Sequence, residues 1–258
     1  MQRWRDEIRM TRGAIKGGAA GAAFIGLAVT LAAPPAAATT LTGSQACAVT
    51  PAADPQRLYG DQIRFDVRRN GDLVGSHTVS FTRDGDRLQT STRFEVAVDV
   101  LFITAYRYVY ASEATWSGAC LEALTATTDD NGKESAVRVS RSGQGLLVSG
   151  PQGTASAARA TLPTEHWAYA VVGDDAVINT ITGRVNRVDI SPAASETVTL
   201  ADGRAVTARR YVYSGELDNE VWYDAEGRWV KMRFPAKDGS SIEYVCVTCG
   251  IDRVSSRS

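Results

Sequence analysis

The chain has 258 residues, of which 44% are hydrophobic, and its 28 basic and 29 acidic residues leave a net charge of −1. Nucleic acids attract proteins with a strongly basic face, so this balance argues against a nucleic-acid partner. The length suits one large domain with its own core and requires no second domain.

The first 38 residues have the layout of a secretory signal peptide. A basic stretch that contains Arg3 and Lys16 precedes an apolar stretch from Ala19 to Ala33, and small residues end at Ala38. A bilayer-spanning helix needs roughly 20 apolar residues, which is more than this stretch offers. We therefore expect cleavage at or next to Ala38, no transmembrane span in the mature chain, and a periplasmic or secreted protein.

Cleavage removes five basic and two acidic residues, so the mature chain carries a net charge of −4. It begins with a flexible lead-in over residues 39–57, which is rich in Ala, Thr, Ser and Pro and has no apolar period. A single β-rich domain follows over residues 58–250, and residues 251–258 form a C-terminal tail.

Strict alternation of apolar and polar residues predicts strands through most of the domain. Ile63, Phe65 and Val67 alternate with charged residues, and Asn70-Gly71 and Asn131-Gly132 are typical of tight hairpin turns. Further strands are expected at 87–100, 104–116, 121–127, 135–141, 145–149, 177–181, 185–190, 196–200, 206–213, 220–223, 229–234 and 242–247. The fold is predicted to be mainly all-β, a strongly curved antiparallel sheet or open half-barrel, with one short helix near 164–172.

Four cysteines, Cys47, Cys120, Cys246 and Cys249, suit disulfides in an oxidising compartment, in any of three pairings. The spacing of Cys246 and Cys249 also leaves a redox pair or a zinc site open. A redox pair usually lies at a helix N-terminus, and a zinc site needs a second close pair, so disulfides are favoured and no metal is predicted.

Two histidines limit the scope for catalysis. His77 shares the apolar parity of its strand and suits an interior, hydrogen-bonded histidine, whereas His166 lies in the segment Pro163-Thr-Glu-His-Trp167 beside aromatic residues. Glu216 belongs to an acidic cluster that is also explained by turns. Because no Gly-x-Ser-x-Gly elbow is present, His166, His77 and Glu216 remain weak catalytic candidates, and no cofactor motif is found.

The aromatic residues are the strongest remaining signal. Trp116, Trp167, Trp222 and Tyr108 lie in predicted strands or in the aromatic segment, where they would fill a core or line a pocket on the concave face of the sheet.

Several segments together resemble a family of uncharacterised periplasmic proteins that carry a domain of unknown function. They include the segment from Arg69 to His77, the segment from Tyr106 to Trp116, His166-Trp167 and Val221-Trp-Tyr-Asp224. The resemblance implies a curved antiparallel sheet, distantly similar to the half-barrels of lipoprotein carriers, and no established activity. Such carriers hold acyl chains on the concave face, which suggests a hydrophobic or amphiphilic ligand.

The sequence therefore predicts an exported, non-enzymatic envelope protein that binds an apolar or amphiphilic small molecule near Tyr108, Trp116, Trp167 and Trp222. A hydrolase or carbohydrate-acting enzyme that uses His166 or Glu216 is one alternative. An assembly or scaffold factor with an exposed apolar patch is another. The sequence does not define the oligomeric state.

Overall fold

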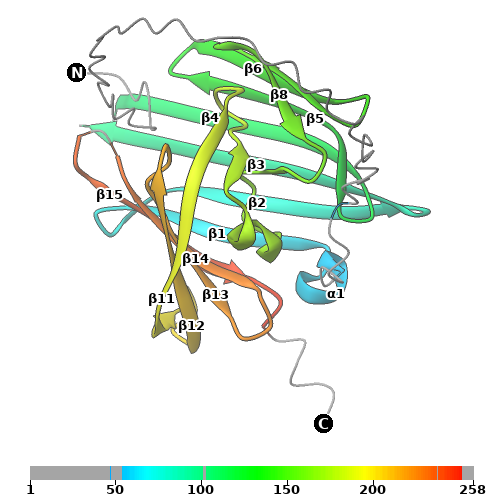
Figure 1. Cartoon of the computed structure of the whole chain (residues 1–258). Helices are drawn as coiled ribbons and strands as arrows, with labels where there is room; N and C mark the ends of the chain where they lie inside the picture. The colour runs from blue at the N-terminus through cyan, green and yellow to red at the C-terminus, as the bar shows by residue number, and fades with distance from the viewer. Residues whose placement is uncertain (1–46, 48–53, 101–102, 237, 252–258) are drawn as a thin grey trace, which may run out of the picture.

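A computed structural model describes residue 47 and residues 54–100, 103–236 and 238–251; the predicted signal peptide and the C-terminal tail from 252 onward lie outside these ranges. Within them, fifteen strands form one sheet in the order β8-β7-β6-β5-β4-β3-β2-β1-β15-β14-β13-β12-β11-β10-β9. Figure 1 shows the sheet bending so that the yellow and orange C-terminal strands cross the cyan and green N-terminal ones. The predicted curved, antiparallel all-β fold is confirmed.

The strands fall into two meanders that meet at β1 and β15. The N-terminal meander runs through β1 (Gln62–Arg69), β2 (Asp72–Asp84), β3 (Arg87–Val100), β4 (Ile103–Ser117), β5 (Cys120–Asp130), β6 (Lys133–Ser142), β7 (Gly145–Gly150) and β8 (Gly153–Ala158). The C-terminal strands are β9 (Leu162–Pro163), β10 (Ala176–Ile178), β11 (Val185–Thr199), β12 (Ala205–Gly215), β13 (Glu220–Asp224), β14 (Trp229–Pro235) and β15 (Ser241–Thr248). Across the described residues, all strand pairings are antiparallel except that of β9 with β10.

The Asn-Gly turns explain the register of two hairpins. Asn70 and Asn131 have φ of 50° and 53°, and the glycine after each also has a positive φ, as a two-residue turn of this type requires. The turns pair Arg69 with Asp72 and Asp130 with Lys133. This geometry fixes which side chains of β1, β2, β5 and β6 point inward.

The structure contains two strands that were not predicted, β8 and β9, and differs from the predicted elements in three further places. The segment expected as a helix near 164–172 is irregular at first and ends in a 3-10 helix, η1 (Tyr169–Gly173). A short helix, α1 (Pro55–Tyr59), precedes β1, where Asp54 accepts a hydrogen bond from the N–H of Gln56. The strands expected at 185–190 and 196–200 are one strand, β11. A β-bulge between Pro192 and Ser195 shifts its register with β12 without ending the pairing of the two strands.

The two ends of the sheet approach each other at a pair of glycines. A Cβ atom added to Gly150, in the β7–β8 hairpin, would lie 2.8 Å from the Cα of Gly183, in the turn before β11. Since any side chain would keep the two backbones apart, this close approach requires glycine.

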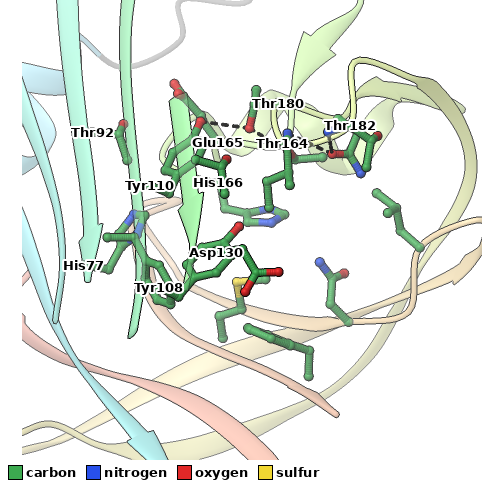
Figure 2. Close-up of a pocket in the computed structure, with 18 of the residues that line it drawn as sticks. His77, Thr92, Tyr108, Tyr110, Asp130, Thr164, Glu165, His166, Thr180 and Thr182 are labelled. Atoms are coloured by element: carbon green, nitrogen blue, oxygen red, sulfur yellow. Dashed lines mark hydrogen bonds between the residues drawn. The ribbon is translucent and has the colours of Figure 1, made fainter. Parts of the chain in front are cut away.

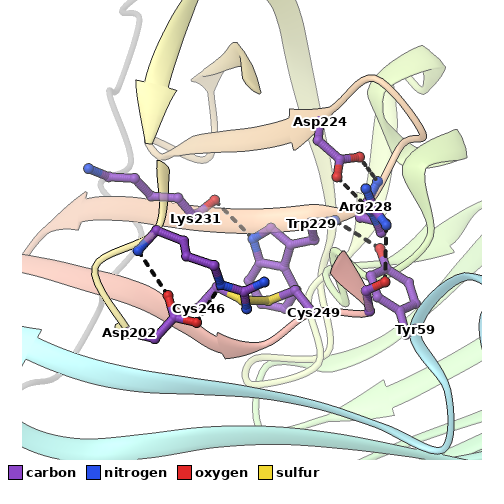
Figure 3. The surroundings of a disulfide bond; sticks show 10 residues. Tyr59, Asp202, Asp224, Arg228, Trp229, Lys231, Cys246 and Cys249 are labelled. Atoms are coloured by element: carbon purple, nitrogen blue, oxygen red, sulfur yellow. Dashed lines mark hydrogen bonds and ion pairs between the residues drawn. A yellow bond between two sulfur atoms is a disulfide. The ribbon is translucent and has the colours of Figure 1, made fainter. Parts of the chain in front are cut away.

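Helix α1 is tied to the C-terminal strands by one buried phenol. The Tyr59 hydroxyl donates to the carbonyl of Trp167 (3.0 Å) and accepts from the N–H of Trp229 (2.9 Å). Beside it the buried guanidinium of Arg228 binds Asp224 (2.6 Å) and the carbonyl of Gly250 (3.0 Å), as Figure 3 shows in part.

All four cysteines are paired in the structure, Cys47 with Cys120 and Cys246 with Cys249. The second disulfide closes a loop of a few residues at the end of β15, in the surroundings of Trp229 (Figure 3). In the part of the chain described, no helix has the length and apolar character needed to cross a bilayer.

Candidate functional site

A cavity of about 370 Å³ lies between the inner face of the N-terminal strands and the C-terminal half of the chain. One wall comes from β2 to β6 and the other from the 164–182 segment, the β12–β13 loop, β14 and β15. Its lining residues are His77, Val79, Thr92, Phe94, Tyr108, Tyr110, Thr128, Asp130, Lys133, Ser135, Pro151, Gln152, Thr164, Glu165, His166, Asn179, Thr180, Ile181, Thr182, Leu217, Asp218, Asn219, Trp229, Met232, Phe234 and Tyr244. The volume lies in the range of about 300–1,000 Å³ typical of small-molecule sites.

Aromatic rings form much of the deep part of the cavity. Phe94 stacks on Tyr244 with their ring centroids 5.7 Å apart and meets Tyr108 edge to face at 5.8 Å. Trp229 lies 5.9 Å from Tyr244. Inward-pointing positions of β3, β4, β14 and β15 thus present one continuous aromatic surface.

Both histidines of the chain meet at this aromatic surface. Figure 2 shows His77, from β2, and His166, from the loop before η1, at the pocket. Their rings lie 5.4 Å and 5.6 Å from the ring of Trp229. Burial lowers the pKa of His77 to about 3 and that of His166 to about 4, with His166 adding a smaller repulsive effect on His77. Both imidazoles are therefore neutral near pH 7.

Glu165, next to His166, is a buried carboxyl group with polar partners on both oxygens. Its Oε1 accepts from the Ser112 hydroxyl (2.6 Å) and its Oε2 from the indole N–H of Trp167 (3.4 Å). Burial raises the pKa of Glu165, and the hydrogen bond from Ser112 opposes this in part. The carboxyl group is held in place by the protein rather than left free to react.

The polar groups nearer the rim come from hairpins and turns. Tyr110 donates to the Thr180 hydroxyl (2.8 Å), and Tyr106 donates to Asp130 (2.8 Å) at the end of β5. Lys133, just across the Asn-Gly turn from Asp130, is exposed. Apart from the buried Glu165, the charged side chains of the lining, Asp130, Lys133 and Asp218, thus lie in a hairpin end or a loop, and the wall of Phe94, Tyr108, Trp229 and Tyr244 is aromatic.

Of the four residues predicted to bind a ligand, Tyr108 lines the cavity and two tryptophans lie behind its wall. Trp116 packs edge to face on Trp167 at 5.3 Å, and its indole N–H donates to the Thr90 hydroxyl (3.2 Å). Neither indole is among the lining residues. Trp167 hydrogen-bonds to Glu165 and Trp116 packs on Trp167, so both have a supporting role in the wall.

Trp222 lies on the opposite face of the sheet. It pairs with Lys231, whose Nζ lies 5.1 Å from the indole centroid, whereas Met232, the next residue along, lines the cavity. Because neighbouring residues of a strand point to opposite faces, Trp222 is a convex-face residue covered by cationic side chains.

Glu216 also lies outside the cavity lining. Its carboxylate binds the Arg184 guanidinium (2.8 Å) and accepts from the backbone N–H of Arg187 (2.7 Å). These contacts hold the start of the β12–β13 loop to β11, which is a structural role.

Sequence reasoning did not single out Glu165, whereas Trp229 belonged to the aromatic group expected to fill a core or line a pocket. The polar pair Glu165-His166 between Thr164 and Trp167 was the available signal, since two consecutive polar residues in an aromatic segment indicate a folded polar site. Among the described residues, no three His, Cys, Asp or Glu side chains are grouped as metal ligands would be.

The fold and the cavity define a class of protein: an open, curved antiparallel sheet that lines an aromatic-walled cavity with polar groups among its lining residues. Residues 65–247 match the family model described as a domain of unknown function (DUF6134), and the chain belongs to this family. No curated protein matches the sequence.

Among solved structures, the chain is similar to a beta-barrel-like protein of domain of unknown function DUF1849 from Brucella abortus. The two are 13% identical with a TM-score of 0.48, over 73% of this chain and 95% of that one.

Proposed function

We propose that this protein is an exported, non-enzymatic binding protein that holds an apolar or amphiphilic small molecule in the cavity between its two meanders. The observation that carries the proposal is the aromatic wall of Phe94, Tyr108, Trp229 and Tyr244 around a cavity of about 370 Å³. Binding of an apolar ligand to such a wall is favourable, because it removes apolar surface from water. The predicted signal peptide and the paired cysteines support an extracytoplasmic location.

Two observations favour binding over the alternatives. In the described residues, no hydrogen bond joins a serine or threonine hydroxyl to either imidazole, so the arrangement of an activated nucleophile and its base is missing. The exposed large hydrophobic side chains of the described part, Leu73, Leu147 and Tyr169, lie in three separate elements and make no patch of the size a scaffold surface needs.

A matched pair of variants tests the proposal. Ser135→Trp places an indole in the cavity, whereas Ser140→Trp places the same side chain on the exposed, opposite face of the same strand, β6. We expect the mature protein to bind the neutral fluorescent hydrophobe N-phenyl-1-naphthylamine, Ser140→Trp to bind it equally well, and Ser135→Trp to lose binding. Equal binding by both variants, with both folded by circular dichroism, would place the hydrophobe outside the cavity and overturn the proposal.

A second measurement detects the natural ligand. Native mass spectrometry of the protein purified from a periplasm, before and after solvent extraction, should show a mass removed by the solvent. The Ser135→Trp variant should lack that mass, and an adduct retained by it would mean that the co-purified molecule binds elsewhere.

A further inference from the structure

The cavity lining contains a histidine with a buried ring nitrogen that no other residue of the described chain hydrogen-bonds. His77 is surrounded by aromatic rings: those of Phe94, Trp229 and Tyr244 lie 6.1 Å, 5.4 Å and 5.1 Å from its own. Its Nδ1 is buried and has no hydrogen-bond partner among the described residues. Interior histidines normally have both nitrogens satisfied, so this one differs from the hydrogen-bonded interior residue that its strand parity predicts.

Two polar residues of the lining, from the loop before η1, do have partners. The carboxyl group of Glu165 accepts from Ser112 and Trp167, and the Nδ1 of His166 lies 3.4 Å from the Tyr213 hydroxyl. The fold therefore supplies hydrogen bonds to the two loop residues and leaves the ring of His77, which is only partly buried, open toward the cavity.

The tautomer of His77 follows from this arrangement. A proton on Nδ1 would have no acceptor in its aromatic surroundings, so the neutral ring keeps its proton on Nε2. The imidazole thus offers the cavity one hydrogen-bond donor, and an oxygen atom is the natural acceptor.

The charge of the site restricts which oxygen atom can bind. Among the described residues, Lys133 is the one lysine or arginine of the lining, and it lies in the exposed β5–β6 hairpin opposite Asp130. A carboxylate or phosphate brought to His77 would lose its water without gaining a cation. A carbonyl or hydroxyl oxygen avoids this penalty.

We infer that the ligand is an apolar molecule with one uncharged oxygen group, a carbonyl or a hydroxyl, which accepts a hydrogen bond from His77 Nε2 while its hydrocarbon part lies on the aromatic wall. This inference rests on the proposed binding function and names the ligand class. His77 is then a binding residue that selects the ligand by its charge.

A series of ten-carbon probes tests the inference by displacement of N-phenyl-1-naphthylamine from the mature protein at pH 7.5. The probes are decan-2-one, decan-1-ol, sodium decanoate and 1-chlorodecane, which differ in the polar end. We expect the ketone and the alcohol to bind about tenfold more tightly than decanoate or the chloride, as one additional hydrogen bond in a closed site would give.

Two variants assign the difference to His77. In His77→Phe, an aromatic ring of similar shape without a donor, the advantage of the ketone over 1-chlorodecane should disappear while 1-chlorodecane still binds. In His77→Gln, whose amide is again a donor, part of the advantage should return. Circular dichroism establishes that each variant is folded.

The possible failures are distinguishable. If no probe and no fluorophore binds, the proposed function itself is wrong. If the fluorophore binds but decanoate competes as well as the ketone, or if His77→Phe weakens all four probes alike, the cavity binds hydrophobes and the inference about the uncharged oxygen is wrong.

Discussion

The contact between Gly150 and Gly183 gives the sharpest prediction about stability. A Cβ atom at Gly150 would lie 2.8 Å from the Cα of Gly183 and 2.9 Å from the carbonyl oxygen of Thr182, both of which are backbone atoms. Relaxed carbon contacts begin at about 3.5 Å, so one of the two turns must move by several tenths of an ångström in Gly150→Ala. Overpacking of this kind costs about 1–3 kcal/mol.

Gly173→Ala is the matched control, because its Cβ would meet no atom within 4 Å and its φ is not in the left-handed region. We expect its free energy of unfolding to stay within about 0.5 kcal/mol of the wild type. Urea unfolding followed by tryptophan fluorescence measures both variants. Equal stability of Gly150→Ala and Gly173→Ala would refute the reasoning, since it would mean that the two ends of the sheet do not touch in solution.

The same contact bears on the cavity, since Pro151, Gln152 and Thr182 line it next to the two glycines. A displaced turn in Gly150→Ala should therefore weaken hydrophobe binding together with stability. Retained affinity in a destabilised variant would show that this rim is not part of the binding surface.

Three further predictions concern buried polar groups. Tyr59→Phe should lower the free energy of unfolding by about 1–3 kcal/mol, because it leaves a buried backbone N–H and carbonyl without their partner; an unchanged urea midpoint would contradict this. Arg228→Met should lower the free energy of unfolding by about 3–5 kcal/mol, because it leaves the Asp224 carboxylate buried without its cation. The double variant with Asp224→Asn, which removes that charge, should restore stability. The pKa of His77 falls from 6.5 unfolded to about 3 folded, so protons favour the unfolded chain and stability falls as pH drops through this range, by at most about 1.4 kcal/mol per pH unit. The stability of wild type relative to His77→Phe should therefore decrease from pH 7 to pH 4 in urea titrations, whereas parallel pH curves would rule out the buried neutral imidazole. Glu165, whose raised pKa acts in the opposite direction, is common to both proteins and cancels in this comparison.

The predictions from sequence succeeded where local signals decide the structure. Alternation at Ile63, Phe65 and Val67 gives a strand with one buried face, and Asn70-Gly71 and Asn131-Gly132 give hairpins with a fixed register. These signals lie within a few residues of the feature that they determine.

The candidate site was harder because it depends on contacts between distant parts of the chain. His77 and His166 meet at Trp229, and alternation says that a residue points inward without saying which other inward residue it meets. For Trp222 the strand pattern was ambiguous, because Val221, Trp222 and Tyr223 are all apolar and all buried, so polarity does not mark one face of β13.

The pairing of β1 with β15 also sets the order in which the fold can be completed. Phe65 lies opposite Cys246, about 180 residues away, whereas most other neighbours in the sheet are consecutive hairpins. As a chain emerges from its N-terminus, the first meander can form from local contacts, but one edge of β1 stays open until β15 arrives. During that interval β1 offers unpaired N–H and C=O groups and the side chains of Ile63, Phe65 and Val67 to any other extended chain. The central ladder of the finished protein is thus an open, aggregation-prone edge while the chain folds, and the strand that closes it contains Cys246, which is bonded to Cys249.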